Sequence, residues 1–94
     1  MTLSIAELAR ARETTAGLLE ELGLEAYLFE VEPHDEQWEL KVDCAMEADG
    51  AWENVTLLVP KEALLASQDD ASLRQRILAE WHDRFVACKL QAGK

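Results

Sequence analysis

Carboxylate side chains are the groups in this sequence with the greatest capacity for chemistry, and most of them lie in one segment. Between Glu20 and Glu53, twelve acidic residues are opposed by Lys41 alone, which gives this segment a net charge of −11. The remainder of the chain sums to +1. Carboxylates can transfer protons, coordinate cations or attract a basic partner. Because they are so numerous, their arrangement in the fold must select among these chemistries.

The two histidines define one alternative, a small enzyme or a subunit of one. His34 precedes Asp35 and Glu36 in a predicted turn, and His82 precedes Asp83 on a predicted helix. A histidine beside a carboxylate can act as a general base when both line a pocket. Zinc sites show a defined ligand spacing that these residues lack. We therefore predict no metal, no cofactor and two solvent-exposed histidines, with catalysis by His34 or His82 as the alternative.

Cys44 and Cys88 are interpreted as free, buried thiols. Cys44 falls on an apolar strand pattern and Cys88 on an apolar helix stripe, where a free cysteine packs as a small hydrophobe. Disulfide-stapled domains usually have more cysteines, and the sequence has no Cys-x-x-Cys motif. A disulfide, a metal site or a catalytic thiol is the alternative. This cysteine usage, together with an N-terminus that does not read as a signal peptide, predicts a cytoplasmic protein.

Length and net charge restrict the class of protein further. A chain of 94 residues with a formal net charge of −10 predicts a single α+β domain spanning 1–94. The negative charge disfavours direct binding of nucleic acid, because that binding depends on Lys and Arg neutralising phosphates. It also disfavours an anionic membrane surface. The apolar runs are too short for a membrane-spanning helix.

The hydrophobic pattern predicts the order α-β-β-β-α-α. A helix over 5–22 follows from apolar residues at three-to-four spacing, and Gly23 can end it. Alternating apolar and polar residues predict three antiparallel strands in a meander. A bare apolar sheet face is unstable in water, so the helices should cover one face of the sheet. The expected strands are 27–32, 37–46 and 52–59, and the expected later helices are 60–66 and about 70–91.

The second hairpin has a strong turn signal. Asp-Gly is favoured in a two-residue loop because both central residues of a type I′ turn need positive φ. A loop at Asp49 and Gly50 places Cys44 opposite Val55. The apolar residues of both strands then share one face, whereas a slip by one residue would reverse them.

The first hairpin predicts where the acidic residues lie. A four-residue turn at 33–36 places Glu30 opposite Glu39, a like-charge pair that destabilises a sheet. The carboxylates of both strands then lie on the sheet face that the helices leave open. With Trp52 as an apolar anchor, they form the predicted partner-binding set: Glu30, Glu32, Glu39, Asp43, Glu47 and Trp52.

This face favours a small, acidic, non-enzymatic interaction module, namely an adaptor, accessory subunit or inhibitor that docks a basic protein partner. An aromatic anchor within charged surroundings is typical of binding surfaces. Mimicry of nucleic acid is one specific form of this hypothesis. The alternatives are an acidic face that only maintains solubility, and a Trp52 that folds over the hairpin end onto the core. A homodimer formed through the sheet edge or the exposed apolar side chains is a further prediction.

Overall fold

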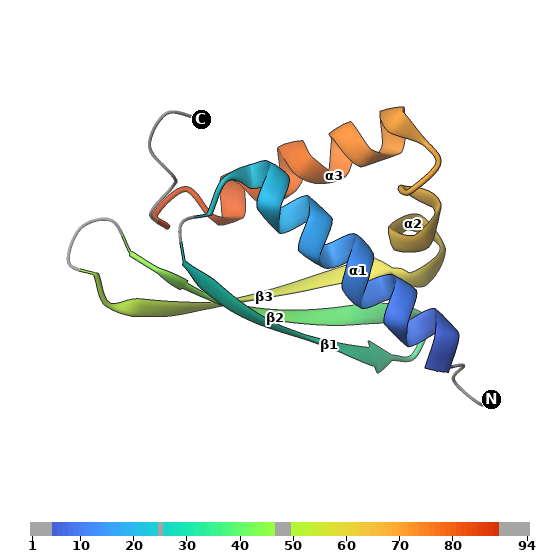
Figure 1. The fold of residues 1–94 in the computed structure, drawn as a ribbon, viewed down its shortest axis with the longest axis horizontal. Helices are drawn as coiled ribbons and strands as arrows, with labels where there is room; N and C mark the ends of the chain where they lie inside the picture. The colour runs from blue at the N-terminus through green and yellow to red at the C-terminus, as the bar shows by residue number, and fades with distance from the viewer. Residues whose placement is uncertain (1–4, 25, 47–49, 89–94) are drawn as a thin grey trace.

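The computed structural model describes residues 5–24, 26–46 and 50–88 and confirms the predicted α+β fold (Figure 1). The sheet has three antiparallel strands in the order β1-β2-β3, with β2 in the centre. All helices lie on one side of it, and the opposite face is open. The elements in chain order are α1 (Ile5–Leu22), β1 (Tyr27–His34), β2 (Gln37–Ala45), β3 (Trp52–Pro60), α2 (Lys61–Ala66) and α3 (Ala71–Arg84).

Local signals in the sequence account for the helix ends. Gly23 follows α1 with a φ of 83°, and its amide donates to the Glu20 carbonyl at 3.0 Å. Glycine adopts this left-handed conformation without steric cost. Pro60 caps α2, so that helix begins one residue later than predicted. The Asp70 carboxylate caps α3 by accepting from the Leu73 amide at 3.1 Å, which satisfies one of the free amides of the first turn.

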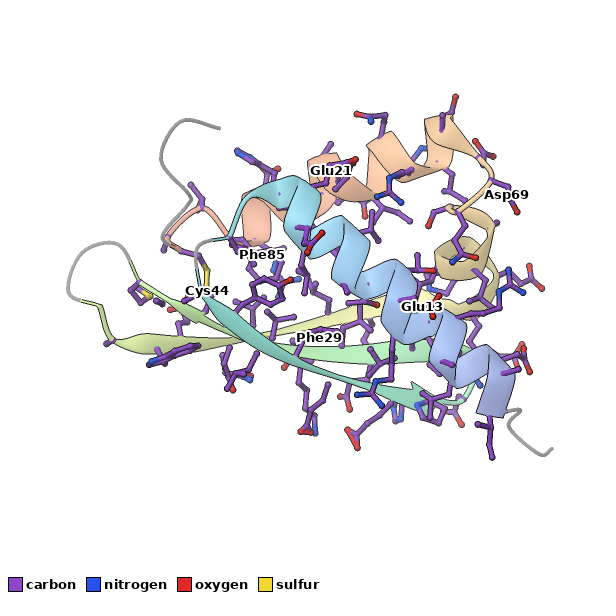
Figure 2. All side chains as sticks on the ribbon, viewed as in Figure 1. Glu13, Glu21, Phe29, Cys44, Asp69 and Phe85 are labelled. Carbon is purple, nitrogen blue, oxygen red and sulfur yellow. A yellow bond between two sulfur atoms is a disulfide. The ribbon has the colours of Figure 1, made fainter. Side chains whose placement is uncertain are left out.

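The core fills the layer between the helices and the inner face of the sheet (Figure 2). Trp38 is fully buried, and the Lys61 ammonium lies 5.5 Å from the centroid of its ring, close enough for a cation–π contact. Trp81 on α3 is also buried, so Trp38 and Trp81 both lie in the core. The most completely buried hydrophobic core residues are Ala11, Leu18, Leu19, Leu24, Trp38, Leu40, Val42, Cys44, Leu64 and Cys88.

Both predicted strand registers are wrong by two residues, although the predicted faces of the strand residues that the structure describes are right. In the first hairpin, His34 pairs with Gln37, so the loop is Asp35 and Glu36 alone. Asp35 adopts a φ of 57°, which lets a two-residue loop replace the predicted four-residue turn. Glu30 therefore lies opposite Lys41 and not opposite Glu39.

In the second hairpin, Val55 pairs with Val42, and Cys44 lies opposite Glu53. The Met46 amide donates to the Ala51 carbonyl at 2.7 Å, so the ladder closes there and not at the predicted Asp49-Gly50 loop. A longer connection moves the pairing by two positions. An even shift leaves each side chain on its own face, because side chains alternate with a period of two.

Cys44 and Cys88 form a disulfide, which corrects the interpretation of two free thiols (Figure 2). Their Cα atoms are 5.8 Å apart, and both residues are buried. The prediction that α3 continues to about residue 91 is also wrong, because the helix ends at Arg84. The chain then turns after Phe85, and Cys88 forms a bridge with Met46 beside the end of β2. The disulfide thus attaches the segment after α3 to the central strand.

Reduction of this disulfide should destabilise the fold. The bond closes a loop with a sequence separation of 44 residues, and cross-links of that length stabilise by about 2–4 kcal/mol in the chain-entropy account. Urea unfolding with and without a phosphine reductant measures the difference in the free energy of unfolding. A variant with Cys44→Ala and Cys88→Ala is the control, and its stability should not respond to reductant. Two titratable thiols in the protein purified without reductant would contradict the disulfide.

Candidate functional site

The open face of the sheet is the surface on which the predicted site residues meet. Glu30, Glu32, Glu39 and Asp43 all lie on this face, because they alternate with buried residues along β1 and β2. Glu47 lies outside the described residues. On β3 the same face is formed by uncharged side chains. We call the β1–β2 part the acidic half and the β3 part the neutral half, which consists of Trp52, Asn54, Thr56 and Leu58.

Lys41 lies in the middle of the acidic half. Its Nζ lies 3.1 Å from Oε1 of Glu32 and 3.9 Å from Oε1 of Glu39. Glu32 and Glu39 face one another across the strands, so the lysine offsets a like-charge pair that the sheet would otherwise contain. Glu30 lies directly opposite Lys41. The acidic half is therefore an organised cluster of three glutamates around one ammonium, and it retains a net negative charge.

Two groups near the sheet have pKa values above their ordinary range. The hydrogen bond that Lys41 donates to Glu32, followed by the negative charges of Glu32, Glu39 and Glu30, raises the pKa of Lys41. Burial raises the pKa of the Tyr27 hydroxyl, and the Glu20 carboxylate adds to the effect. In both cases the folded state binds the proton more tightly than the unfolded chain. Stability from these groups is therefore complete at neutral pH and is lost as pH rises through the raised pKa.

Removal of the lysine charge should reveal this linkage. Lys41→Gln leaves Glu32 and Glu39 opposed without a cation, so the free energy of unfolding should fall at neutral pH and low salt. The deficit relative to wild type should shrink in high salt, which screens exposed charges. It should also shrink at strongly alkaline pH, where wild type loses its own ammonium charge. Lys41→Arg, which retains the charge, is the control, and urea unfolding across pH measures both. A deficit unchanged by salt and pH would contradict the electrostatic account.

The neutral half exposes large apolar side chains to solvent. Trp52 is 55% exposed and Leu58 is 53% exposed, and both point away from the helices. Trp52 pairs with Ala45 at the end of the sheet, so the alternative that it folds onto the core is wrong. Leu28, at the start of β1, adds a third exposed apolar side chain at 66%. Exposed aromatic and aliphatic groups beside a charged cluster can act as anchors for a partner.

A polar link joins the two halves. The Asn54 side-chain amide donates to Asp43 Oδ1 at 2.9 Å, and the Thr56 hydroxyl donates to Asn54 Oδ1 at 3.3 Å. Asp43 and Asn54 are directly opposite in the ladder, which explains the short contact. A shallow depression of about 260 Å³ lies beside this link, between Leu28 and Lys41. The link holds the Asp43 carboxylate in a fixed position on the face.

The outer edge of β3 is one of the two sheet edges through which the sequence predicts that a homodimer can form. The Met46 amide points toward β3 and the Ala45 amide points toward β1. Main-chain groups along these strands therefore alternate, residue by residue, between one neighbouring side and the other. The main-chain groups of Trp52, Asn54, Thr56 and Leu58 consequently point outward, away from β2. Arg84 donates from Nη2 to the Thr56 carbonyl at 3.0 Å. In the part of the chain described, the outward amides and carbonyls of the other three have no main-chain partner.

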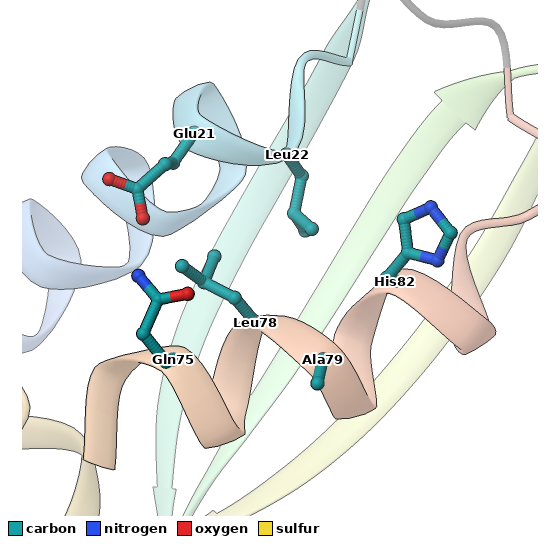
Figure 3. A pocket seen from close by; sticks show the side chains of 6 residues that line it. All are labelled: Glu21, Leu22, Gln75, Leu78, Ala79 and His82. Atoms are coloured by element: carbon teal, nitrogen blue, oxygen red, sulfur yellow. The ribbon is translucent and has the colours of Figure 1, made fainter. Parts of the chain in front are cut away.

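The histidine alternative depends on a groove between α1 and α3 (Figure 3). This groove has a volume of about 380 Å³, and both His82 and Glu21 line it. Glu21 is held by Arg74 at 3.3 Å, and its carboxylate points toward Gln75, at the opposite end from His82. The His82 ring pairs with Asp83, with 3.9 Å between Nδ1 and Oδ1, and both side chains are largely exposed. The groove thus separates its histidine from its carboxylate.

His34 lies at the other end of the molecule, exposed beside the first hairpin loop. The structure therefore does not bring the two histidines together. Within residues 5–24, 26–46 and 50–88, no group of three or more His, Cys, Asp or Glu side chains could hold a metal ion. The same residues include no helix that is both long and apolar enough to cross a membrane.

Comparison with protein-family models, with curated proteins and with solved structures gave no match. The functional argument for this chain therefore depends on its own geometry.

Proposed function

We propose that the protein is a non-enzymatic interaction module, an adaptor, accessory subunit or inhibitor, that docks a basic protein partner on its open sheet face. The observation that supports this most strongly is the arrangement of Glu30, Glu32 and Glu39 around a single lysine on a rigid, exposed sheet. Charge of one sign on such a face steers a partner of opposite charge and orients it. Imitation of nucleic acid phosphates is a narrower form of the same proposal.

The neutral half supplies exposed apolar area, which a partner can bury and which the charged side chains do not provide. Exposed ion pairs contribute little net affinity, because solvent and salt weaken them. Trp52 and Leu58, each about half exposed, can bury apolar area against the partner. The acidic half then sets orientation and rate of encounter, while the apolar side chains stabilise the docked complex. A partner of matching chemistry has a basic strip beside an apolar patch.

The disulfide bears on where this protein works. A cytoplasmic location was predicted from cysteines interpreted as free, and the Cys44–Cys88 bond removes that argument. Disulfides persist in oxidising compartments and are rare where glutathione keeps thiols reduced. We therefore propose that the protein acts where this bond is maintained. An enzyme that uses His82 in the helical groove is the second candidate, supported by the groove alone.

Loss of charge from the acidic half should weaken partner capture at low salt without unfolding the protein, because the charges set the rate of encounter and the orientation. In Glu30→Gln/Glu32→Gln, two exposed carboxylates become neutral isosteres, so stability should change by less than about 1 kcal/mol. The matched control, Glu13→Gln/Glu80→Gln, removes the same charge from exposed helix positions. Each protein is immobilised in its oxidised form and exposed to cell lysate at low and high salt. Retained proteins are identified by mass spectrometry.

The expected result is a basic protein that wild type and the control retain equally, that the acidic-half variant retains less, and that salt releases in part. Equal retention by both variants would contradict docking on this face. Retention that is lost in His82→Ala and unchanged in Glu30→Gln/Glu32→Gln would favour the helical groove instead.

A further inference from the structure

The outer edge of β3 lacks the features that normally keep a sheet edge from pairing. Natural edges are protected by lysine, proline, bulges or covering elements. The one proline of β3 is its last residue, Pro60; before it the strand contains no lysine, arginine or proline, and its pairing with β2 runs without a bulge. The other edge, β1, contains Pro33, which has no amide hydrogen to donate. The two edges of this sheet are thus unequal, and β3 is the one open to a further strand.

The side chains along this edge are complementary to a second copy of themselves. Consider two β3 strands that pair antiparallel about a twofold axis at Val55. Trp52 of one copy then lies opposite Leu58 of the other, and Asn54 lies opposite Thr56. All four residues point their main-chain groups outward, so each pair can exchange hydrogen bonds. Both exposed apolar side chains of the neutral half gain a cross-strand apolar neighbour, which stabilises sheets.

Charge favours the same edge. Glu53 is the one charged residue of β3, although the chain has a net charge of −10. Two copies that meet at β3 therefore bring together the least charged strip of the sheet and keep their acidic halves apart. Arg84 does not prevent this pairing. A carbonyl oxygen has two lone pairs, so Thr56 can accept from both Arg84 and the new strand.

We infer that the protein forms a twofold homodimer through β3, which joins two sheets into one of six strands. The joined open face has an apolar centre formed by Trp52 and Leu58 of both copies and an acidic half at each outer side. It offers a basic partner two equivalent acidic surfaces. This inference does not rest on the proposed function, because the dimer forms without any other protein.

Sedimentation of the oxidised, full-length chain over a micromolar to submillimolar range tests the dimer. An edge contact lies at the small end of stable interfaces, so we expect a dissociation constant in the micromolar range. Leu58→Lys should raise that constant about tenfold or more. Leu28→Lys is the matched control, because it makes the same change on the same open face at the opposite side of the sheet, and it should leave the constant unchanged.

Thr56→Pro separates edge pairing from stacking of open faces. The Thr56 amide points outward, so proline removes no hydrogen bond to β2 but blocks an added strand. Circular dichroism verifies that this variant is folded. If it is not, the contrast between Leu58→Lys and Leu28→Lys decides the question, because both lie on the open face and only Leu58 lies on the β3 edge. In wild type, the Asn54 and Leu58 amides should exchange hydrogen more slowly at high protein concentration.

A wild-type protein that remains monomeric over the whole range overturns the inference. So does a dimer that Leu28→Lys disrupts and Thr56→Pro does not, because that pattern indicates face-to-face stacking. A dimer retained in Glu30→Gln/Glu32→Gln supports it, whether or not that variant still captures a basic partner.

Discussion

The central strand β2 is the element on which the rest of the structure depends. Its inward side chains, Trp38, Leu40, Val42 and Cys44, are all 0% exposed. Strands on both sides hydrogen-bond to it, and helices cover its inner face. Trp38 lies beneath Lys61 at one end, and Cys44 binds the segment after α3 at the other. Since a domain of this size has little apolar area to spare, that fully buried row supports both edge strands.

The same constraint produces the open face on which the candidate site residues lie. Because side chains alternate across a strand, each buried position on β2 leaves its neighbour on the open face. Lys41 and Glu39 occupy two of these positions, and the register with β1 brings Glu32 to both. On β3 the corresponding positions have Trp52 and Leu58. One small sheet thus separates charge from apolar area, which can give orientation and adhesion to a single partner.

Much of this arrangement is predictable from sequence, and the exceptions have physical causes. Alternation assigned the acidic residues and Trp52 to strands, and the faces of Glu30, Glu32, Glu39, Asp43 and Trp52 are as predicted. Strand register depends on the length of the hairpin loop, which the sequence does not determine. The shorter loop changes the cross-strand partner of Glu30 from Glu39 to Lys41 and leaves Glu30 on the same face. The Cys44–Cys88 bond was missed because it requires α3 to end at Arg84, a tertiary effect that helical periodicity does not report. Which strands lie at the edges depends on the order of the strands in the sheet, and the hydrophobic pattern of one strand does not report that order.

The central claim is that the open sheet face, rather than the helical side, is the working surface of this molecule. The most direct test is a two-dimensional amide spectrum of the ¹⁵N-labelled, oxidised protein in cell lysate. The account predicts that signals of Glu30, Glu39 and Trp52 weaken at low salt and recover at high salt, while those of the exposed faces of α1 and α3 persist. Weakening centred on Glu21 and His82, with the sheet signals unchanged, would contradict it.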